Sequence, residues 1–414
     1  MIVNKFGGAS IKNTEAIQRM ANICKEHMSQ GVIVVSAMGK TTNLLEKLTH
    51  HYYKGSDFQE FRQQFESYHR QIIESLFPLE NQIFGEFSNV LKELDHKTSK
   101  KPSLNYDYEY DQIVSFGEML STRIVAAYLN LQQIKVEWVD IRNCLKTDST
   151  FREGRINWEL TGKLIAKQFA DSDKKLFLTQ GFIGSDQNNQ TTTLGREGSD
   201  YTAAIIANSL NAQKVVVWKD VVGILCADPD WMSGAEKITR LSYADAIELT
   251  YYGAKVIHPK TVKPLQNKEI PLQVRSFLTL SDEGTLIGPF ESSDFPPVYI
   301  KKEAQVLVSI RPLDFSFIME ENLSHIFAVL AKHQIQVNLM QTSALNFSIS
   351  VDTNMNRVPK AIEELKLHYK VKYNDQLELI TIRHYKPGAE NKILEGKTIL
   401  VEQRSRTMSR FILR

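Results

Sequence analysis

The sequence predicts an α/β protein with a mostly parallel, helix-covered sheet, followed by a smaller C-terminal α+β domain of the ferredoxin-like type. Two observations carry this prediction. From residue 1 to about residue 290, short β-branched runs alternate with amphipathic helical stretches, which is the pattern of a parallel sheet with helices on its faces. From about residue 304 to about residue 374, the pattern follows the order βαββαβ.

Length and composition limit the class of protein further. A chain of 414 residues exceeds what one compact core usually supports, so two domains are expected. A net charge of +2 gives no long-range field that would draw the molecule onto nucleic acid or an anionic membrane. No apolar run approaches the ~20 residues of a membrane span, and the segment MIVNKFGG enters a strand without signal-peptide features. We therefore expect a cytoplasmic protein, in keeping with the separated Cys24, Cys144 and Cys226.

The first domain is expected to span residues 1–292. It opens with a strand at 2–6 and a helix that Asn13 can cap, since apolar residues recur there at i, i+3, i+4 and i+7. Residues 56–130 are nearly all helical in pattern, and we interpret them as a helical insertion or lid. Further strands are expected at 32–37, 136–139, 176–179 and 215–218, and further helices near 41–53, 158–170, 200–210 and 242–252.

The segment FESSDFPP at 290–297 marks the domain boundary, because two prolines follow a polar run. The region 298–414 then carries one complete βαββαβ unit at about 304–374. Its strand at 345–351 alternates cleanly between apolar and polar residues. A strand at 377–383 and a final hairpin leave no room for another complete unit, so the second unit is predicted to be truncated.

The segment KFGGAS, from Lys5 to Ser10, follows the first strand and leads toward the first helix. Gly7 and Gly8 allow backbone N–H groups to approach an anion, and a helix N-terminus adds positive potential. Lys5 can reach a phosphate as a point charge. An ordinary Gly-Gly turn beside a surface lysine explains this segment about equally well.

The segment VVSAMGKTTN ends a strand and opens a helix. A Walker A interpretation fails, because that motif needs a glycine where Val34 stands. Ser36 and Thr42 remain as hydroxyl donors beside a helix N-terminus, which favours a bound carboxylate. Simple helix capping is the alternative for Thr41 or Thr42.

Three further segments carry charged residues beside apolar helices or strands. Glu118 in SFGE is either a solvated residue or a partner for a substrate ammonium group. The loop TTTLGREGSD supplies Arg196, which can bind a carboxylate through two parallel hydrogen bonds, and Asp200, which can simply interact with the helix dipole. His258 precedes a proline and is interpreted as a packed or capping side chain, and the histidine spacing predicts no protein-built metal centre.

The motifs occur together in the order KFGGAS, VVSAMGKTTN, SFGE, QGFIG, TTTLGREGSDYTAA, KDVVGILCADP and GAKVIHP. This ordered set resembles aspartate kinases of the amino-acid kinase family, and the C-terminal unit resembles their ACT regulatory domains. The resemblance implies an amino-acid kinase-like fold and phosphorylation of the β-carboxylate of L-aspartate by ATP with Mg²⁺, giving 4-phospho-L-aspartate. It also implies feedback regulation of lysine, threonine and methionine biosynthesis, and a homodimer or higher homo-oligomer formed through the ACT-like region.

The resemblance implies that Mg²⁺ is held mainly by nucleotide phosphates rather than by the protein. It also implies roles for individual residues. Lys5 and Asp200 would be catalytic. The aspartate would be bound by Ser36, Thr42, Glu118, Arg196 and Ser199. The nucleotide would be bound by Lys5, Phe6, Gly7, Gly8, Lys219, Asp220 and Lys255.

Several residues differ from the family pattern. Lys219, Leu225 and Asp230 stand where threonine, tyrosine and arginine are usual. Asn338 replaces an aspartate of many lysine-sensitive relatives, so inhibition by lysine alone is predicted to be weak or absent. Two alternatives remain open: a kinase of the same superfamily that acts on glutamate or a nucleoside monophosphate, and an ACT-bearing sensor without turnover.

Overall fold

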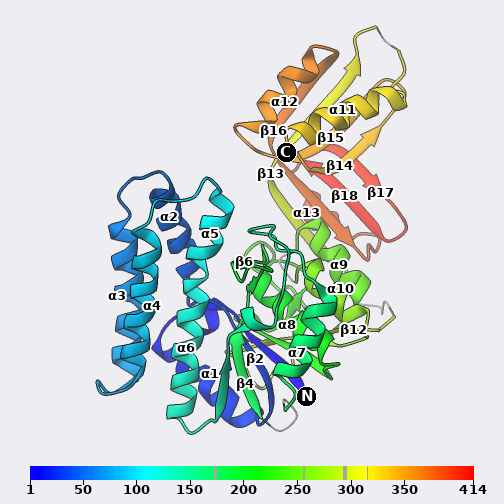
Figure 1. Cartoon of the computed structure of the whole chain (residues 1–414). Coiled ribbons are helices and arrows are strands. Elements are labelled where there is room, and N and C mark those ends of the chain that lie inside the picture. Colours follow the sequence, from blue (N-terminus) through cyan, green and yellow to red (C-terminus); the bar gives the residue numbers. More distant parts are fainter. Residues whose placement is uncertain (172–174, 255–256, 292–295, 315) are drawn as a thin grey trace. The chain divides into compact units, whose positions relative to one another are not determined.

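The protein is seen in a computed structural model that describes residues 1–171, 175–254, 257–291, 296–314 and 316–414 (Figure 1). The chain divides into two compact units. Unit 1 comprises Met1–Ile224, Lys237–Ile247 and Val256–Ser293. Unit 2 comprises Leu225–Glu236, Glu248–Lys255 and Asp294–Arg414.

Unit 1 is built on an eight-stranded sheet in the order β10-β12-β11-β7-β1-β2-β4-β3. All neighbouring pairs are parallel except β11 and β12, so the prediction of a mostly parallel sheet is confirmed. The strands are β1 (Ile2–Phe6), β2 (Gly31–Val35), β3 (Val136–Val139), β4 (Leu176–Gln180), β7 (Lys214–Lys219), β10 (Arg240–Ser242), β11 (Leu272–Ser276) and β12 (Thr285–Gly288). The interior strand β2 is buried along its whole length, as expected for a sheet covered on both faces.

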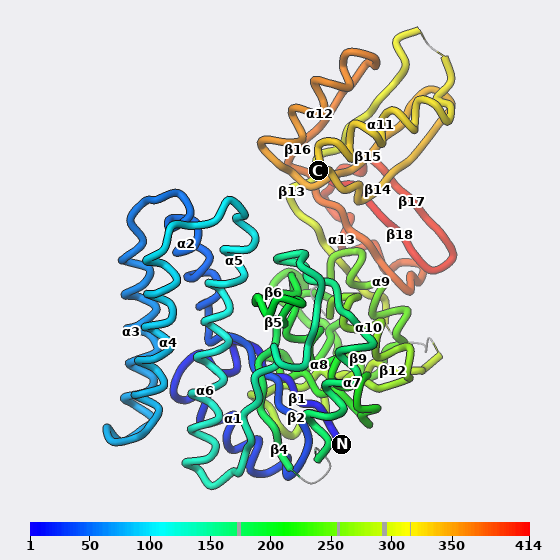
Figure 2. Tube along the Cα trace, viewed as in Figure 1, coloured from blue at the N-terminus to red at the C-terminus, as the bar shows by residue number. Residues whose placement is uncertain are grey.

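Helices cover this sheet, and Figure 2 follows the chain as it passes between them. Asn13 caps the first helix by accepting the backbone N–H of Ala16 at 3.0 Å, as the sequence predicts. The helices outside the insertion are α1 (Thr14–His27), α2 (Thr41–Tyr53), α7 (Trp158–Gln168), α8 (Gly198–Ser209), α9 (Tyr243–Tyr252) and α10 (Pro259–Gln266), with short turns η1 (Gly8–Ile11) and η2 (Ile141–Asn143). Two small two-stranded sheets pair β5 (Ile183–Ser185) with β6 (Thr191–Thr193) and β8 (Ile224–Leu225) with β9 (Lys237–Ile238).

The segment 56–130 contains the helices α3 (Gln59–Leu76), α4 (Ile83–Thr98), α5 (Tyr106–Val114) and most of α6 (Phe116–Leu131). α3 and α4 lie side by side, with α6 next to α4 (Figure 1). Their apolar faces, with Phe65, Phe87 and Leu94 fully or almost fully buried, join the same core as the sheet residues. The insertion is therefore packed onto the sheet rather than held apart from it.

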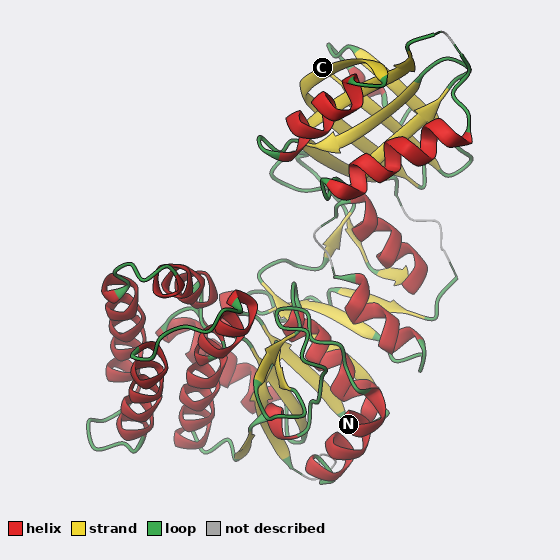
Figure 3. Cartoon of the chain, turned by 45° about the horizontal axis from the view of Figure 1, so that its top comes forward, coloured by secondary structure: helices red, strands yellow, loops and turns green. Residues whose placement is uncertain are grey.

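Unit 2 contains a six-stranded sheet in the order β14-β15-β13-β16-β18-β17. Two helices cover one face of this sheet (Figure 3), where Val308, Ile326 and Ile362 share a buried cluster. The strands are β13 (Val298–Pro312), β14 (Val337–Thr342), β15 (Phe347–Asp352), β16 (Tyr369–Arg383), β17 (Ile399–Arg404) and β18 (Met408–Leu413), and the helices are α11 (Glu320–Lys332), α12 (Arg357–Lys366) and α13 (Asn391–Leu394). The prediction of a C-terminal α+β domain is confirmed.

One element of unit 2 differs from the sequence analysis. The last strand of the predicted βαββαβ unit and the strand predicted at 377–383 form one continuous strand, β16. It pairs with the equally long β13, and the register shifts between Lys302 and Leu307. At this irregularity Ala304 and Gln376 adopt left-handed backbone, with φ values of 52° and 55°. A β-bulge accommodates the interruption of the apolar pattern. The hydrogen-bonded pairing of β13 with β16 therefore continues on both sides of the bulge, between the two predicted strands.

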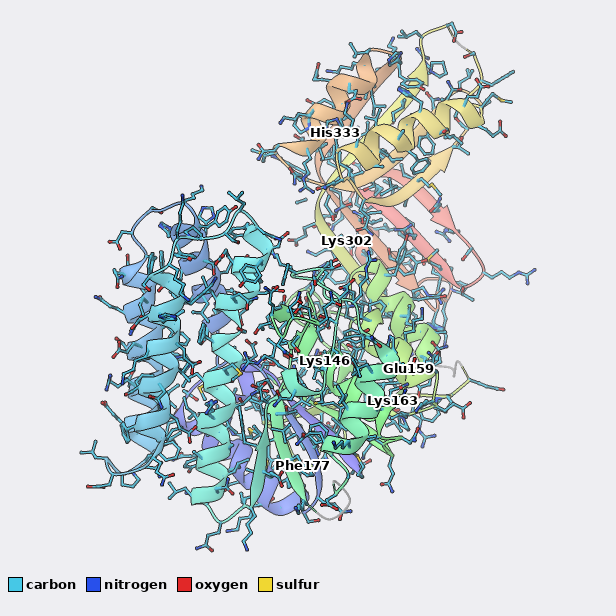
Figure 4. The ribbon with its side chains drawn as sticks, in the orientation of Figure 1. Lys146, Glu159, Lys163, Phe177, Lys302 and His333 are labelled. Atoms are coloured by element: carbon cyan, nitrogen blue, oxygen red, sulfur yellow. The ribbon has the colours of Figure 1, made fainter. Side chains whose placement is uncertain are left out.

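A partly buried polar network lies on the other face of this sheet. Lys302 (Figure 4) donates from Nζ to Asn338 Oδ1 at 2.8 Å. The Asn338 amide in turn donates to Gln305 Oε1 at 2.9 Å and to Asp352 Oδ1 at 2.7 Å. Ser350, which the alternating pattern places on the polar face, is fully buried, and the hydrogen bond from its hydroxyl to Gln305 Oε1 at 3.0 Å compensates for this burial. On the polar face of β15, Ser350 is therefore an interior residue, whereas Ser348 is half-buried and Asp352 is exposed.

The segment 225–236 packs with unit 2, although it precedes the predicted boundary by about sixty residues. The backbone N–H of Tyr299 donates to Cys226 O at 2.7 Å. Trp231 and Met232 pack against a buried cluster that includes Ile380 and Phe411. Local sequence gives no sign of this grouping, because it depends on which apolar surface the segment meets in the folded chain.

Candidate active site

A cavity of about 890 Å³ lies in unit 1, beside the carboxyl ends of β1, β2 and β7. Open parallel sheets place their ligand sites at this edge, where neighbouring loops leave the strands. The loop after each of these strands contributes residues to the wall of the cavity, as does the N-terminus of α8. Segments far apart in the sequence therefore meet at one site.

The turn after β1 brings the backbone close to the next loop. A Cβ atom at Gly8 would lie only 2.7 Å from Ala37 O and 2.8 Å from Gly39 O, so a larger residue would force the two loops apart. The backbone N–H of Gly39 donates to Gly8 O at 3.0 Å and closes this contact. The turn is thus fixed where its backbone can face a phosphate group.

Lys5 and Asp200 form an ion pair at the base of the cavity, with 2.6 Å between Nζ and Oδ1. Lys219 Nζ lies 4.0 Å from the other carboxylate oxygen of Asp200. Burial alone would raise the pKa of Asp200, but the charges of Lys5 and Lys219 outweigh it and hold the pKa below its ordinary value. The site therefore contains an ionised carboxylate that orients two ammonium groups.

Glu118 lies on the first turn of α6 and is 2% exposed. Its Oε1 accepts the backbone N–H of Ala37 at 3.2 Å, whereas Oε2 is buried without a hydrogen-bond partner. Burial raises the pKa of Glu118 to about 8. A buried carboxylate with an unused oxygen is suited to a cationic group of a ligand, because such a group would supply the missing donor.

The loop between β6 and α8 carries Arg196, whose side chain is exposed at the cavity. Its neighbours both adopt left-handed backbone, with φ values of 75° at Gly195 and 54° at Glu197. The Glu197 carboxylate accepts the backbone N–H of His258 at 2.9 Å, which ties this turn to the start of α10. Arg196 is therefore presented by a turn of defined shape rather than by a free loop.

The structure brings most of the predicted site residues together. Those that line the cavity are Lys5, Gly7, Gly8, Ser36, Thr42, Glu118, Arg196, Ser199, Asp200, Lys219 and Asp220. Phe6 does not line it, because its side chain is fully buried and stacks on Trp218 with 5.7 Å between ring centroids. Lys255 lies outside the described residues. The chemical roles assigned to these residues stay predictions.

The sequence analysis missed other residues of the cavity wall. Arg152 lies there with a left-handed φ of 67°, and its guanidinium group is 4.2 Å from the centroid of the Tyr110 ring. Phe182 and Phe277 also contribute. The polar segment around Arg152, which separates two predicted elements, was the available signal.

His258 has the capping role that the sequence predicts, since its Nδ1 accepts the backbone N–H of Lys260 at 3.2 Å at the start of α10. The described part of the chain contains no group of three or more His, Cys, Asp or Glu residues that could hold a metal ion. Within that same part, none of the helices combines the length and apolar character of a membrane span.

The fold and this cavity define a class of α/β proteins whose ligand site lies at the carboxyl ends of a mostly parallel sheet. The sequence profile described as the amino acid kinase family matches residues 1–276. Lysine-sensitive aspartokinase 3 of Escherichia coli is 32% identical over 358 residues, which cover 85% of this chain and 78% of the relative. The chain therefore belongs to the amino acid kinase family and, within it, to the aspartokinases.

Two solved structures agree with this assignment. E. coli aspartokinase III in complex with lysine and aspartate, described as the T-state, superposes with a TM-score of 0.84 at 28% identity and covers 100% of this chain and 95% of that one. The same enzyme in complex with aspartate and ADP, described as the R-state, gives a TM-score of 0.82 at 28% identity, with coverage of 100% and 96%. The resemblance found in the sequence is confirmed.

Proposed function

We propose that the protein is an aspartate kinase that transfers the γ-phosphoryl group of ATP to the β-carboxylate of L-aspartate and forms 4-phospho-L-aspartate. This reaction is the first step of lysine, threonine and methionine biosynthesis. The observation that carries the proposal is the cavity that joins the Lys5–Asp200 ion pair to Glu118 and Arg196. The names of the relatives, and the aspartate and ADP complexes of E. coli aspartokinase III, support it.

The reaction needs no general base. The β-carboxylate of aspartate has an ordinary pKa near ~4 and is ionised at neutral pH. One carboxylate oxygen forms a bond to the γ-phosphorus, the bond from that phosphorus to the bridging oxygen breaks, and its electron pair leaves with ADP. No histidine is found among the described residues that line the cavity, which agrees with this chemistry.

Catalysis then depends on charge neutralisation and on in-line positioning, because two anions must approach each other. Lys5 supplies positive charge where negative charge develops on the transferred group, and Asp200 holds the Lys5 ammonium in place at 2.6 Å. Gly7 and Gly8 form the phosphate turn. Lys219, Asp220 and Lys255 are assigned to the nucleotide side, with Phe6 contributing through its backbone.

The amino-acid substrate has three charged groups, and the opposite part of the cavity offers matching partners. Arg196 binds a carboxylate through two parallel hydrogen bonds. Glu118 binds the α-ammonium group with its unused oxygen. The hydroxyl groups of Ser36, Thr42 and Ser199 complete the substrate pocket.

ATP is proposed to bind with Mg²⁺ held mainly by its own phosphate oxygens. Mg²⁺ commonly binds through substrate phosphates and one or two carboxylates, and Asp200 and Asp220 both line the cavity. The ion would neutralise phosphate charge when it is bound.

We assign the C-terminal region 298–414 to feedback regulation as an ACT-like region with one complete unit and a truncated second unit. The lysine complex of E. coli aspartokinase III supports a regulatory role. The same region is proposed to join chains into a homodimer or a higher homo-oligomer. We place the protein in the cytoplasm, with no nucleic-acid or membrane partner.

The test is ADP release with ATP and Mg²⁺ in the presence of L-aspartate, with hydroxylamine added to trap the acyl phosphate as aspartyl hydroxamate. L-glutamate and a nucleoside monophosphate serve as competing acceptors. Arg196→Ala should lower kcat/KM for aspartate at least ~100-fold and leave nucleotide binding nearly unchanged. Equal turnover with glutamate, or no turnover with aspartate, would overturn the proposal.

A further inference from the structure

Asp111 is a buried carboxylate to which the proposed reaction assigns no part. It lies on α5 and is 0% exposed, although its neighbours Tyr110, Arg152 and Thr193 all line the cavity. Burial raises the pKa of Asp111 to about 6. A carboxylate in such a place needs hydrogen bonds to compensate for its burial, and the partners that provide them indicate what it does.

Asp111 accepts three hydrogen bonds from two separate segments. Its Oδ2 accepts the backbone N–H of Arg152 at 2.9 Å and the backbone N–H of Thr193 at 2.8 Å. Its Oδ1 accepts the Thr193 hydroxyl at 2.7 Å. The Asp111 carboxylate thus holds the segment of Arg152 and the segment of Thr193, both in the cavity wall, against α5.

The two segments that Asp111 holds both contribute to the wall of the proposed substrate pocket. Arg152 has a left-handed φ of 67°, which a residue other than glycine rarely adopts without support from its surroundings. Thr193 is the last residue of β6, three residues before Arg196. The position of the Arg196 turn therefore depends on where Asp111 holds the end of β6.

The same helical segment also carries the partner of the substrate ammonium group. α6 follows α5 after Ser115, and the backbone N–H of Met119 donates to Ser115 O at 3.0 Å across the junction. Glu118 lies in the first turn of α6 and is held by the Ala37 N–H. Asp111 thus connects the element that carries Glu118 to the segment that carries Arg196.

We propose that Asp111 is a positioning residue that fixes the separation between Glu118 and Arg196 and thereby selects aspartate over glutamate, which is one methylene longer. The inference rests on the proposed function and adds the origin of its substrate selectivity. The inference takes Arg196 as the partner of the side-chain carboxylate and Glu118 as the partner of the α-ammonium group. A site that holds these two groups at a fixed separation discriminates against one extra methylene by about 10–200-fold. Loss of the Asp111 hydrogen bonds should reduce this discrimination between aspartate and glutamate without changing the affinity for the nucleotide.

Two variants test the inference against a matched control. Asp111→Asn keeps the shape of the side chain, but its amide has one acceptor oxygen where three donors converge. Thr193→Val removes the hydroxyl contact and leaves the backbone contact of Thr193 in place. Glu159→Gln makes the same carboxylate-to-amide change on the exposed α7, where Glu159 pairs with Lys163 at 2.6 Å (Figure 4).

The experiment measures kcat and KM for aspartate, glutamate and ATP in each variant, together with circular dichroism and thermal melting. We expect Asp111→Asn to raise KM for aspartate about tenfold or more and to change KM for ATP less than about twofold. The ratio of kcat/KM for aspartate to that for glutamate should fall at least about fivefold. Thr193→Val should also raise KM for aspartate and lower the aspartate-to-glutamate ratio of kcat/KM, but by less than Asp111→Asn does. Glu159→Gln should match the wild type in all of these quantities.

An unchanged aspartate-to-glutamate ratio in Asp111→Asn, or a parallel rise of KM for aspartate and ATP, would overturn the inference. If Asp111→Asn does not fold, Thr193→Val decides, and an unchanged ratio in that variant would overturn it as well. Absence of aspartate turnover in the wild type would overturn the proposed function itself, which is a different result from normal turnover with unaltered selectivity.

Discussion

The unusual state of Glu118 predicts that aspartate binding is coupled to the loss of a proton. Burial raises the pKa of Glu118 to about 8, so at pH 7 only ~10% of the ligand-free protein carries the ionised side chain. The substrate ammonium group requires the ionised form. We therefore expect the apparent affinity for aspartate at pH 7 to be about tenfold lower, or weaker by ~1.4 kcal/mol, than in a protein in which Glu118 is always ionised.

Two measurements check this coupling. Titration calorimetry of aspartate at pH 7, repeated in buffers of different ionisation enthalpy, should show release of close to one proton. The KM for aspartate should fall about tenfold between pH 7 and pH 8.5. A KM that stays constant over this range, together with no proton release, would refute the reasoning about Glu118.

The raised pKa of Glu118 also predicts that the stability of the folded protein decreases over the pH range in which aspartate binding improves. The folded-state pKa of about 8 lies above the ordinary value of 4.5, so between these values the folded protein holds a proton that the unfolded chain has lost. Stability is therefore lost as the pH rises through this window, by up to ~5 kcal/mol. Glu118→Gln should abolish tight aspartate binding and yet raise the free energy of unfolding at pH 8, measured by urea denaturation. Equal stability of the variant and the wild type at pH 8 would contradict this account.

Three further predictions concern other parts of the chain. Lys5→Ala should lower kcat at least ~100-fold with a smaller change in KM for aspartate, because its charge matters most as the phosphoryl group moves, and steady-state kinetics would show a normal kcat if this role is wrong. His69 is fully buried, and burial lowers its pKa to about 4 from 6.5, so the unfolded chain binds the extra proton and stability is lost as the pH falls through this window, by up to ~3 kcal/mol. His69→Gln should flatten that part of the pH–stability curve in chemical denaturation, and an unchanged curve would count against it. Lysine alone should inhibit weakly, because the Asn338 amide oxygen already accepts from Lys302 at 2.8 Å, and half-inhibition by sub-millimolar lysine in the ADP assay would disprove this.

The order of the motifs in the sequence was sufficient to predict which strands and turns would form the site. Lys5, Glu118, Arg196 and Asp200 were singled out because charged residues stood beside glycine turns or apolar helices, and all four line one cavity. Their meeting follows from the parallel sheet, whose strands end at the same edge. The strand alternation and the cap at Asn13 were equally readable, because they depend on neighbours in the chain.

The connections across long sequence separations were not readable. Asp111 meets Thr193, and Glu197 meets the backbone of His258, across 82 and 61 residues. The segment 225–236 joins unit 2 in the same way. Such contacts depend on which surfaces the folded chain brings together, and nothing in the local pattern around Asp111 or Glu197 specifies its partner.

The sequence by itself determined the class of fold, the order of the elements and the chemical types of residue available to the site, because these depend on periodicity and on turn chemistry along the chain. Only the tertiary structure decided the electrostatic state of those residues. Glu118 and Asp200 are both buried acids, yet the pKa of Glu118 is raised to about 8 and that of Asp200 is lowered. The difference arises because Lys5 and Lys219 face Asp200, whereas Glu118 receives one backbone N–H and keeps a buried oxygen without a partner.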